Sequence, residues 1–136
     1  ENLLSAIRRI DGVTEARAPE ELAGWLLVAT ARRAEGPVND LLGALEAAGV
    51  TSMPYTILLG DAVDVADNDA ALFHWLANCD MARDVMPVSG AGRAAVAFDA
   101  TPKSPGSARG MPVRPWPPLI AMDDATKQRV AALPGS

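Results

Sequence analysis

Over residues 25–59 the sequence reads WLLVATARRAEGPVNDLLGALEAAGVTSMPYTILL. Its first six residues and its last five are apolar runs of strand length, which is typical of strands that are covered on both faces. Between them, Gly36-Pro37 opens a helix predicted over about residues 38–48, and Gly49 ends it. The face of this helix that we expect to be buried carries Leu41, Leu42, Leu45 and Ala48. The order strand, helix, strand predicts a parallel crossover unit.

The residues before this unit predict a helix and a strand. Asn2 is a suitable cap for a short helix that ends at Asp11-Gly12. The apolar face of this helix consists of Leu3, Leu4, Ile7 and Ile10. Residues 13–16 predict a short strand, and residues 19–21 form a loop between it and the first apolar run.

The residues after the unit predict two more helices and a strand. Asp67 is the expected cap of a helix that continues to Asn78. The residues of this helix that we expect to face the core are Leu72, Phe73, Leu76 and Ala77. Residues 94–98 alternate as a strand does, and Asp123 or Asp124 caps a terminal helix that reaches Leu133. The predicted fold is an α/β layered domain with a central mixed or mainly parallel sheet flanked by helices.

Length and charge limit the organisation of the chain. Its 136 residues fit a single domain over residues 1–136 and exclude two large domains. The net charge of −5 argues against a nucleic-acid partner, whose recognition rests on neutralising phosphates. Residues 1–86 form an acidic body with 14 acidic and six basic residues, whereas residues 87–136 have three acidic and six basic residues and eight of the eleven prolines. We expect this basic, proline-rich segment to cross the acidic body or a neighbouring subunit, and self-association to be sensitive to salt.

The sequence also indicates a compartment. Cys79 is the only cysteine, which excludes an internal disulfide and suits a reducing cytoplasm. The longest apolar run, residues 22–31, is far shorter than the roughly 20 residues that span a bilayer, so we expect no transmembrane segment. The chain begins with Glu1 instead of Met, so we interpret it as a piece of a longer polypeptide.

A metal or thiol site at the only histidine is not favoured. His74 and Cys79 are five residues apart on the predicted helix, so their side chains diverge by about 140° and do not easily share a ligand with Asp80. We expect His74 on an exposed flank of the helix and Cys79 packed at its end.

Two other motifs have simple structural interpretations. The aspartates at positions 61, 64, 67 and 69 lack the alternating oxygen donors of a calcium loop, because Val63 and Val65 stand between them, so we expect capping and solvation. Ser89-Gly90-Ala91-Gly92 lacks both the first glycine of a nucleophile elbow and the lysine of a phosphate-binding loop, which favours a flexible turn.

The basic and tryptophan residues leave alternatives open. Arg93, Lys103, Arg109 and Arg114 either are solvated and paired with nearby acids or hold an anion. Trp25, Trp75 and Trp116 are packing residues, with Trp116 also suited to an interface. Because no acid, base and nucleophile come together, the residues predict a non-catalytic α/β domain with no catalytic, cofactor-binding or metal-binding residue of its own.

Two motifs in fixed order carry a resemblance to a known family. The first runs from Leu58 to Asp69, continues with Leu72-Phe73 and closes with Cys79-Asp80-Met81-Ala82-Arg83-Asp84-Val85. The second is Phe98-Asp99-Ala100-Thr101-Pro102-Lys103, followed by Trp116-Pro117-Pro118 and Met122-Asp123. From residue 10 onward, the chain resembles the C-terminal domain of the UbiD family of decarboxylases. Its departures from the family pattern are Gly60, Ala62, Phe73, Asn78 and Met81.

The resemblance implies a role within a larger enzyme. UbiD-family enzymes carry out reversible, non-oxidative decarboxylation of aromatic or α,β-unsaturated acids with prenylated FMN and a divalent metal. The resemblance places that flavin, the metal and the catalytic residues in a preceding domain, so it assigns no catalytic residue to this chain. It implies that this chain is an oligomerisation and lid domain. Such a domain packs against its own N-terminal flavin-binding domain and takes part in a homo-oligomer, a dimer or higher. Helix 67–78 and the proline-rich segment are the expected contacts.

The alternative to this role is a free-standing small-ligand-binding or regulatory α/β subunit, in which Arg93 to Arg114 receive an anion. A third hypothesis is a structural interaction module. The reading frame upstream of Glu1 distinguishes the first two. Substrate, strand order and oligomer size do not follow from the sequence.

Overall fold

The computed structural model describes residues 2–31, 38–89, 94–103 and 121–135. The helices and strands of this part of the chain are α1 (Leu3–Arg8), β1 (Val13–Arg17), β2 (Trp25–Thr30), α2 (Val38–Ala47), the 3₁₀ helix η1 (Val50–Ser52), β3 (Tyr55–Gly60), α3 (Asn68–Asn78), β4 (Val85–Val88), β5 (Ala95–Ala100) and α4 (Asp124–Ala131).

The strands form one mixed sheet in the order β1-β2-β3-β5-β4. The central strands β2, β3 and β5 are parallel, and the two edge strands are antiparallel to their neighbours. The crossover predicted from residues 25–59 is confirmed, because β2 and β3 pair in parallel from Trp25–Tyr55 to Thr30–Gly60. The α/β architecture with a mixed central sheet is therefore correct.

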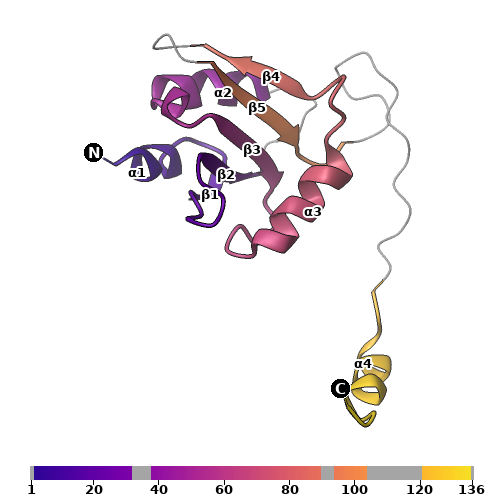
Figure 1. Ribbon diagram of the computed structural model, residues 1–136. Helices are drawn as coiled ribbons and strands as arrows, with labels where there is room; N and C mark the ends of the chain where they lie inside the picture. Colours follow the sequence, from indigo (N-terminus) through magenta and orange to yellow (C-terminus); the bar gives the residue numbers. More distant parts are fainter. Residues whose placement is uncertain (1, 32–37, 90–93, 104–120, 136) are drawn as a thin grey trace.

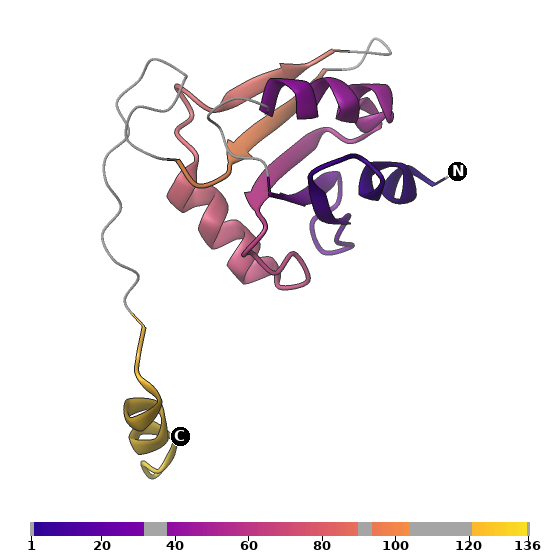
Figure 2. The ribbon, with the colours of Figure 1, turned by 180° about the vertical axis from the view of Figure 1, so that it is seen from behind.

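Helices cover both faces of the sheet. Helices α1 and α2 pack on one face through Ile7, Leu41 and Leu45, all fully buried. Helix α3 lies on the other face, as the two opposite views in Figure 1 and Figure 2 show. Strand β2 is buried on both sides, since alternate residues enter the two core clusters. Its continuous apolar run reflects this double cover.

The expected helix caps are present. The Asn2 side chain accepts from Leu4 N–H, and Asp67 accepts from Asp69 and Ala70 N–H at the start of α3. Asp123 accepts from Thr126 N–H at 2.7 Å and caps α4. These side chains satisfy backbone donors that have no partner within the helix. Helix α4 has no buried residue.

The predicted orientation of α3 is wrong. Phe73 and Leu76 were expected to face the core, yet they are 61% and 68% exposed. Ala71 is fully buried instead, and the half-buried Trp75 packs beside it against the sheet. Because α3 is apolar on more than one side, its periodicity cannot indicate which side meets the sheet.

Strand β4 was not anticipated. It has only four residues, and Pro87 interrupts its apolar pattern. At a sheet edge proline is tolerated, because the side facing solvent has no ladder partner for the missing N–H. The strand forms an antiparallel hairpin arm with β5, in which Val85 pairs with Phe98.

Gly60, at the end of β3, allows the chain after β5 to approach closely. A Cβ at Gly60 would lie 2.8 Å from Cδ of Pro102. The Pro102 ring is rigid, so Gly60→Ala must displace the backbone of this segment. We expect a loss of about 1–3 kcal/mol in the free energy of unfolding, measured by urea denaturation.

Gly43→Ala is the matched control for this substitution. Gly43 lies within α2, and a Cβ there meets no atom within 4 Å. Alanine loses less backbone entropy than glycine on entering a helix, so this variant should gain about 0.5–1 kcal/mol. Equal effects of the two variants would contradict the close contact at Gly60.

Candidate functional site

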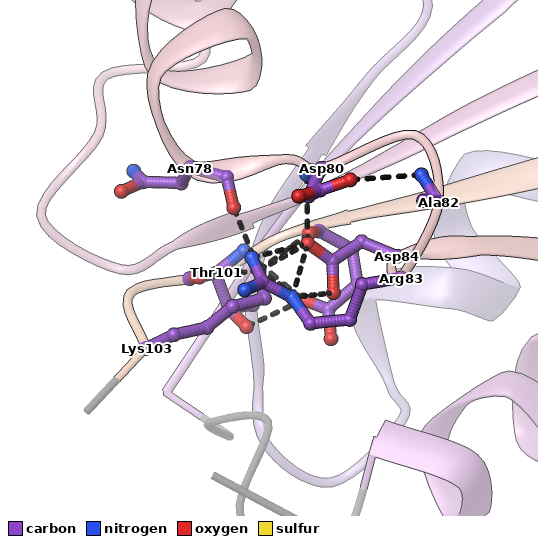
Figure 3. A network of polar contacts seen from close by, with 8 residues as sticks. Asn78, Asp80, Ala82, Arg83, Asp84, Thr101 and Lys103 are labelled. Atoms are coloured by element: carbon purple, nitrogen blue, oxygen red, sulfur yellow. Dashed lines mark hydrogen bonds and ion pairs between the residues drawn. The ribbon is translucent and has the colours of Figure 1, made fainter. Parts of the chain in front are cut away.

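The two motifs of the resemblance meet in a buried cluster of charges at the carboxyl end of β5 (Figure 3). We call Arg83, Asp84, Asp99, Thr101 and Lys103 the charge cluster. Both carboxylates have no exposed area, and the Lys103 side chain is 2% exposed. Two cations and two carboxylates give the cluster a formal charge of zero.

Lys103 is the centre of the cluster. Its Nζ donates to the carbonyl oxygens of Asn78 at 2.9 Å, Asp99 at 2.6 Å and Thr101 at 3.0 Å. The same nitrogen lies 3.5 Å from Asp84 Oδ2 and 3.6 Å from Asp99 Oδ1. The ammonium therefore joins the C-terminal end of α3 to the segment that follows β5.

Asp84 accepts hydrogen bonds from two residues of the same turn, Asp80 and Arg83. Its Oδ2 accepts from Asp80 N–H at 2.8 Å and from Arg83 Nη2 at 2.8 Å, while Arg83 Nε donates to Oδ1 at 2.9 Å. Burial alone would raise the pKa of Asp84. The hydrogen bonds from Arg83 and Asp80, together with the charges of Lys103 and Arg83, outweigh burial and lower the pKa below its usual range.

Asp99 and Thr101 form a local turn within the cluster. The Thr101 hydroxyl donates to Asp99 Oδ1 at 2.5 Å, and Thr101 N–H donates to the same oxygen at 3.1 Å. Asp99 N–H donates to the Asp84 carbonyl oxygen at 2.9 Å, which links the two motifs through the backbone as well.

This arrangement suits a structural role. The charged groups hydrogen-bond one another and nearby carbonyl groups, and they are shielded from water. A general acid or base has to reach a substrate proton, which a fully buried carboxylate does not do. The charge cluster fastens the end of α3 to the exit of β5.

The sequence motifs contained these residues, but reasoning from the residues missed the cluster they form. Lys103 is one of the four basic residues for which the sequence leaves pairing and anion binding open, and the structure shows it paired with Asp84 and Asp99. The other three, Arg93, Arg109 and Arg114, lie outside the described residues. The sequence gives one indication of the cluster: both of the motifs that contain these residues match the family pattern.

Cys79 lies next to the charge cluster, half-buried at the end of α3 as expected. Burial, followed by the charge of Asp84, raises the pKa of its thiol to about 11. The thiol is therefore protonated at neutral pH, which makes it a poor nucleophile.

His74 lies on one side of α3, partly buried, beside a small pocket of about 120 Å³ at the carboxyl ends of the parallel strands. Thr30, Gly60, Asp61 and Pro102 are among the other residues that line it. Pockets that bind small molecules usually measure about 300–1,000 Å³, so this one is of a size for a few water molecules.

The aspartates that precede α3 stabilise turns. Asp64 accepts from Ala66 N–H at 2.8 Å, and Asp67 caps the helix. Within the described ranges, no group of three or more His, Cys, Asp or Glu residues is placed to hold a metal ion. Of the predicted glycine-rich turn, residues 90–92 are outside the described part. Ser89 N–H donates to Glu46 at 2.9 Å.

Two of the three tryptophans pack as expected. Trp25 and Trp75 lie 5.2 Å apart, edge to face, in the core cluster under α3. Trp116 lies outside the described residues. In the portion of the chain that the structure covers, no helix is both long and apolar enough to cross a membrane.

Solved structures share this fold. The open form of vanillic acid decarboxylase from Sedimentibacter hydroxybenzoicus matches 95% of this chain with a TM-score of 0.67 and 14% identity. The UbiD-class enzyme HmfF from Pelotomaculum thermopropionicum, in complex with FMN, matches 95% with a TM-score of 0.66 and 16% identity. The apo 3,4-dihydroxybenzoic acid decarboxylase from Klebsiella pneumoniae matches 96% with a TM-score of 0.58 and 14% identity.

The match covers 30%, 31% and 32% of those three chains, respectively, so this chain spans about a third of the length of its structural neighbours. A search of curated proteins finds no match. The family model of the 3-octaprenyl-4-hydroxybenzoate carboxy-lyase C-terminal domain matches residues 2–110, which include the first motif and the Phe98–Lys103 part of the second. The chain therefore belongs to the UbiD C-terminal domain family.

Proposed function

We propose that this chain is the non-catalytic C-terminal domain of a cytoplasmic UbiD-like carboxy-lyase, and that it serves in oligomerisation and as a lid. In this proposal residues 1–136 are one domain. The parent enzyme decarboxylates an aromatic or α,β-unsaturated carboxylic acid, reversibly and without an oxidant. The chemistry belongs to a preceding flavin-binding domain.

The structural neighbours support the identity of the parent. They include decarboxylases of vanillic acid and of 3,4-dihydroxybenzoic acid, and HmfF in complex with FMN or with prenylated FMN. This chain corresponds to about a third of those chains, which leaves ample length for a flavin-binding domain. One form of HmfF is described as an evolved dimeric form, so self-association occurs among these neighbours.

The observation that carries the non-catalytic role is the internal pairing of the charge cluster. Its two carboxylates are fully buried and bonded to groups of the same domain. The pocket beside His74 measures only about 120 Å³, and among the described residues no group of three or more His, Cys, Asp or Glu is placed to hold a metal ion. A rigid domain of this kind acts by excluding water and holding the substrate when it closes over an active site.

The free-standing ligand-binding subunit receives less support. Its expected anion site rests on Arg93, Arg109 and Arg114, which lie outside the described residues, while Lys103 is already paired. The proposed docking of the proline-rich segment also involves undescribed residues and stays a prediction, tested by the effect of salt on self-association.

A cofactor titration tests the proposed division of labour. We expect the 136-residue chain to cause no saturable change in the absorbance or fluorescence of prenylated FMN, and to release no CO₂ from aromatic acids when the cofactor is supplied. A flavodoxin titrated with FMN serves as the positive control. Saturable one-to-one binding of prenylated FMN would place the cofactor site in this chain and overturn the proposal.

The coding sequence upstream of Glu1 provides an independent test. A long open frame that supplies an arginine and paired glutamates supports the proposal. An initiator codon immediately upstream of Glu1 supports the free-standing subunit instead.

A further inference from the structure

The two edges of the sheet need protection, because a sheet edge presents backbone N–H and C=O groups to which a further strand can pair. The sheet ends in β1 on one side and in β4 on the other (Figure 1). Both strands are antiparallel to their neighbours, so alternate residues of each direct their N–H and C=O groups away from the sheet. The contacts of these outward groups decide whether either edge can accept another strand.

Strand β4 is protected by its length and by Pro87. Asp99 N–H donates to the Asp84 carbonyl oxygen, so the alternation along the strand directs the backbone groups of Val85 and Pro87 outward. Proline has no N–H, so a strand that paired here would lack one of the donors it needs. With only four residues, β4 also offers few positions for pairing.

Strand β1 has no proline, and its outward backbone groups at Ala16 are bonded to side chains instead. Ala16 N–H donates to Glu15 Oε1 at 2.8 Å, and the Ala16 carbonyl oxygen accepts from Arg8 Nη2 at 2.7 Å. Arg8 Nε donates to the same Glu15 oxygen at 2.7 Å. These three bonds form a closed ring around the outer side of Ala16. We call Arg8 and Glu15 the edge pair.

Helix α1 positions the edge pair. Ile7 is fully buried in the same core cluster as Ala16, which fixes α1 against β1. Arg8 follows Ile7 in the last turn of the helix, and its guanidinium reaches the outer side of the strand. The side chains of Arg8 and Glu15 are 48% and 52% exposed, so they stand where an added strand would approach. The methyl group of Ala16 is too small to shield its own backbone, so the neighbouring side chains do so.

We propose that the edge pair blocks β1 from pairing with β1 of a second copy of this chain. An incoming strand could bond to Ala16 only after both side chains had left it, and the two charges would then lose their shared hydrogen bonds. The register with β2 also shifts between Val13 and Glu15, a bulge that increases the local twist and disfavours a flat edge. The device excludes the edge-to-edge joining of sheets and does not depend on the oligomerisation role proposed above.

Two alanine variants of the 136-residue chain test the edge pair. Arg8→Ala frees the Ala16 carbonyl oxygen and changes the net charge from −5 to −6, whereas Glu15→Ala frees the Ala16 N–H and changes it from −5 to −4. We expect both variants to form β-rich assemblies, with thioflavin T fluorescence and light scattering at least about tenfold above wild type. Charge repulsion alone would change the two variants in opposite directions, since their net charges change in opposite directions.

An ion pair on α4, outside the sheet, supplies the matched controls. Lys127 and Asp124 pair at 3.3 Å, and their alanine variants make the same two changes in net charge. We expect both to remain within about twofold of wild type, because exposed ion pairs contribute little. Glu15→Gln keeps an oxygen that accepts from Ala16 N–H and from Arg8, so it should also remain within about twofold of wild type. Circular dichroism verifies that each variant is folded.

Hydrogen exchange of Ala16 tests the proposal in the wild-type chain as well. We expect the Ala16 amide to exchange about as slowly as the ladder amides between β1 and β2, and roughly tenfold faster in Glu15→Ala. The proposal is overturned if the wild-type Ala16 amide exchanges at the rate of an open amide, or if both folded edge-pair variants stay free of β-rich assemblies. Assembly of only one edge-pair variant also overturns it, as does equal assembly of the α4 variants. Each of these results leaves the proposed function of the domain unchanged.

Discussion

Replacing Lys103 with methionine lowers the free energy of unfolding by about 3–5 kcal/mol, the range expected when one partner of a buried ion pair is removed. Methionine fills a similar volume, but it offers no donor to the carbonyl oxygens of Asn78, Asp99 and Thr101. It also takes one of two cations away from two fully buried carboxylates. For a domain of this size the melting temperature should fall by about 10–20 °C in a circular dichroism scan.

Lys127→Met provides the control for this variant. Lys127 pairs with Asp124 at 3.3 Å on the surface of α4, where the two side chains are 60% and 91% exposed. Exposed ion pairs contribute little, so we expect a shift in melting temperature within about 2 °C. If both lysine variants melt at the same temperature, the charge cluster does not hold the domain together.

Removing the Asp84 charge should both destabilise the domain and alter its response to acid. Because the pKa of folded Asp84 is lowered, its contribution is fully present above its unfolded pKa of about 3.9 and is lost as the pH falls through the lower folded pKa. Asp84→Asn cannot gain or lose that proton. We expect urea denaturation of this variant to give a free energy of unfolding about 3–5 kcal/mol below wild type at pH 7. The difference should narrow below about pH 4.

Glu15→Gln is the control for Asp84→Asn, because it removes a carboxylate that lies outside the charge cluster. The hydrogen bond from Ala16 N–H, followed by that from Arg8, also lowers the pKa of Glu15, which gives the same sign of pH dependence. Its side chain is 52% exposed, however, so solvent screens the pair with Arg8. If Glu15→Gln lowers the free energy of unfolding at pH 7 as much as Asp84→Asn does, burial of the charge cluster adds nothing to the stability of the domain.

Much of the sheet could be predicted because its signals are local. The apolar runs that start at Trp25 and Tyr55 are long enough to identify buried strands, and the polar caps Asn2, Asp67 and Asp123 mark helix starts. A cap is recognisable because its hydrogen bonds reach only two or three residues along the chain. Strand β4 escaped prediction because four residues with an edge proline give no such signal.

The orientation of α3 could not be predicted for a different reason. Its apolar residues lie on more than one side, so several rotations bury similar numbers of them. Packing selected Trp75, whose ring meets both Trp25 and Phe98. That choice left Leu76 exposed, and it depends on strands that are distant in the sequence.

The charge cluster shows most clearly which features follow from the local sequence and which depend on the tertiary structure. Local pattern and composition alone were sufficient to establish the α/β class, the crossover unit and the helix caps, since each depends on neighbours within a turn or a strand. The partners of Lys103 come from α3, from the turn before β4 and from the end of β5. The pairing of β4 with β5 brings Asp84 beside Asp99, and Pro102, directly before Lys103, lies close against Gly60. Because buried charges are tolerated only when such distant groups meet with good geometry, the tertiary structure decided that these residues form a structural cluster.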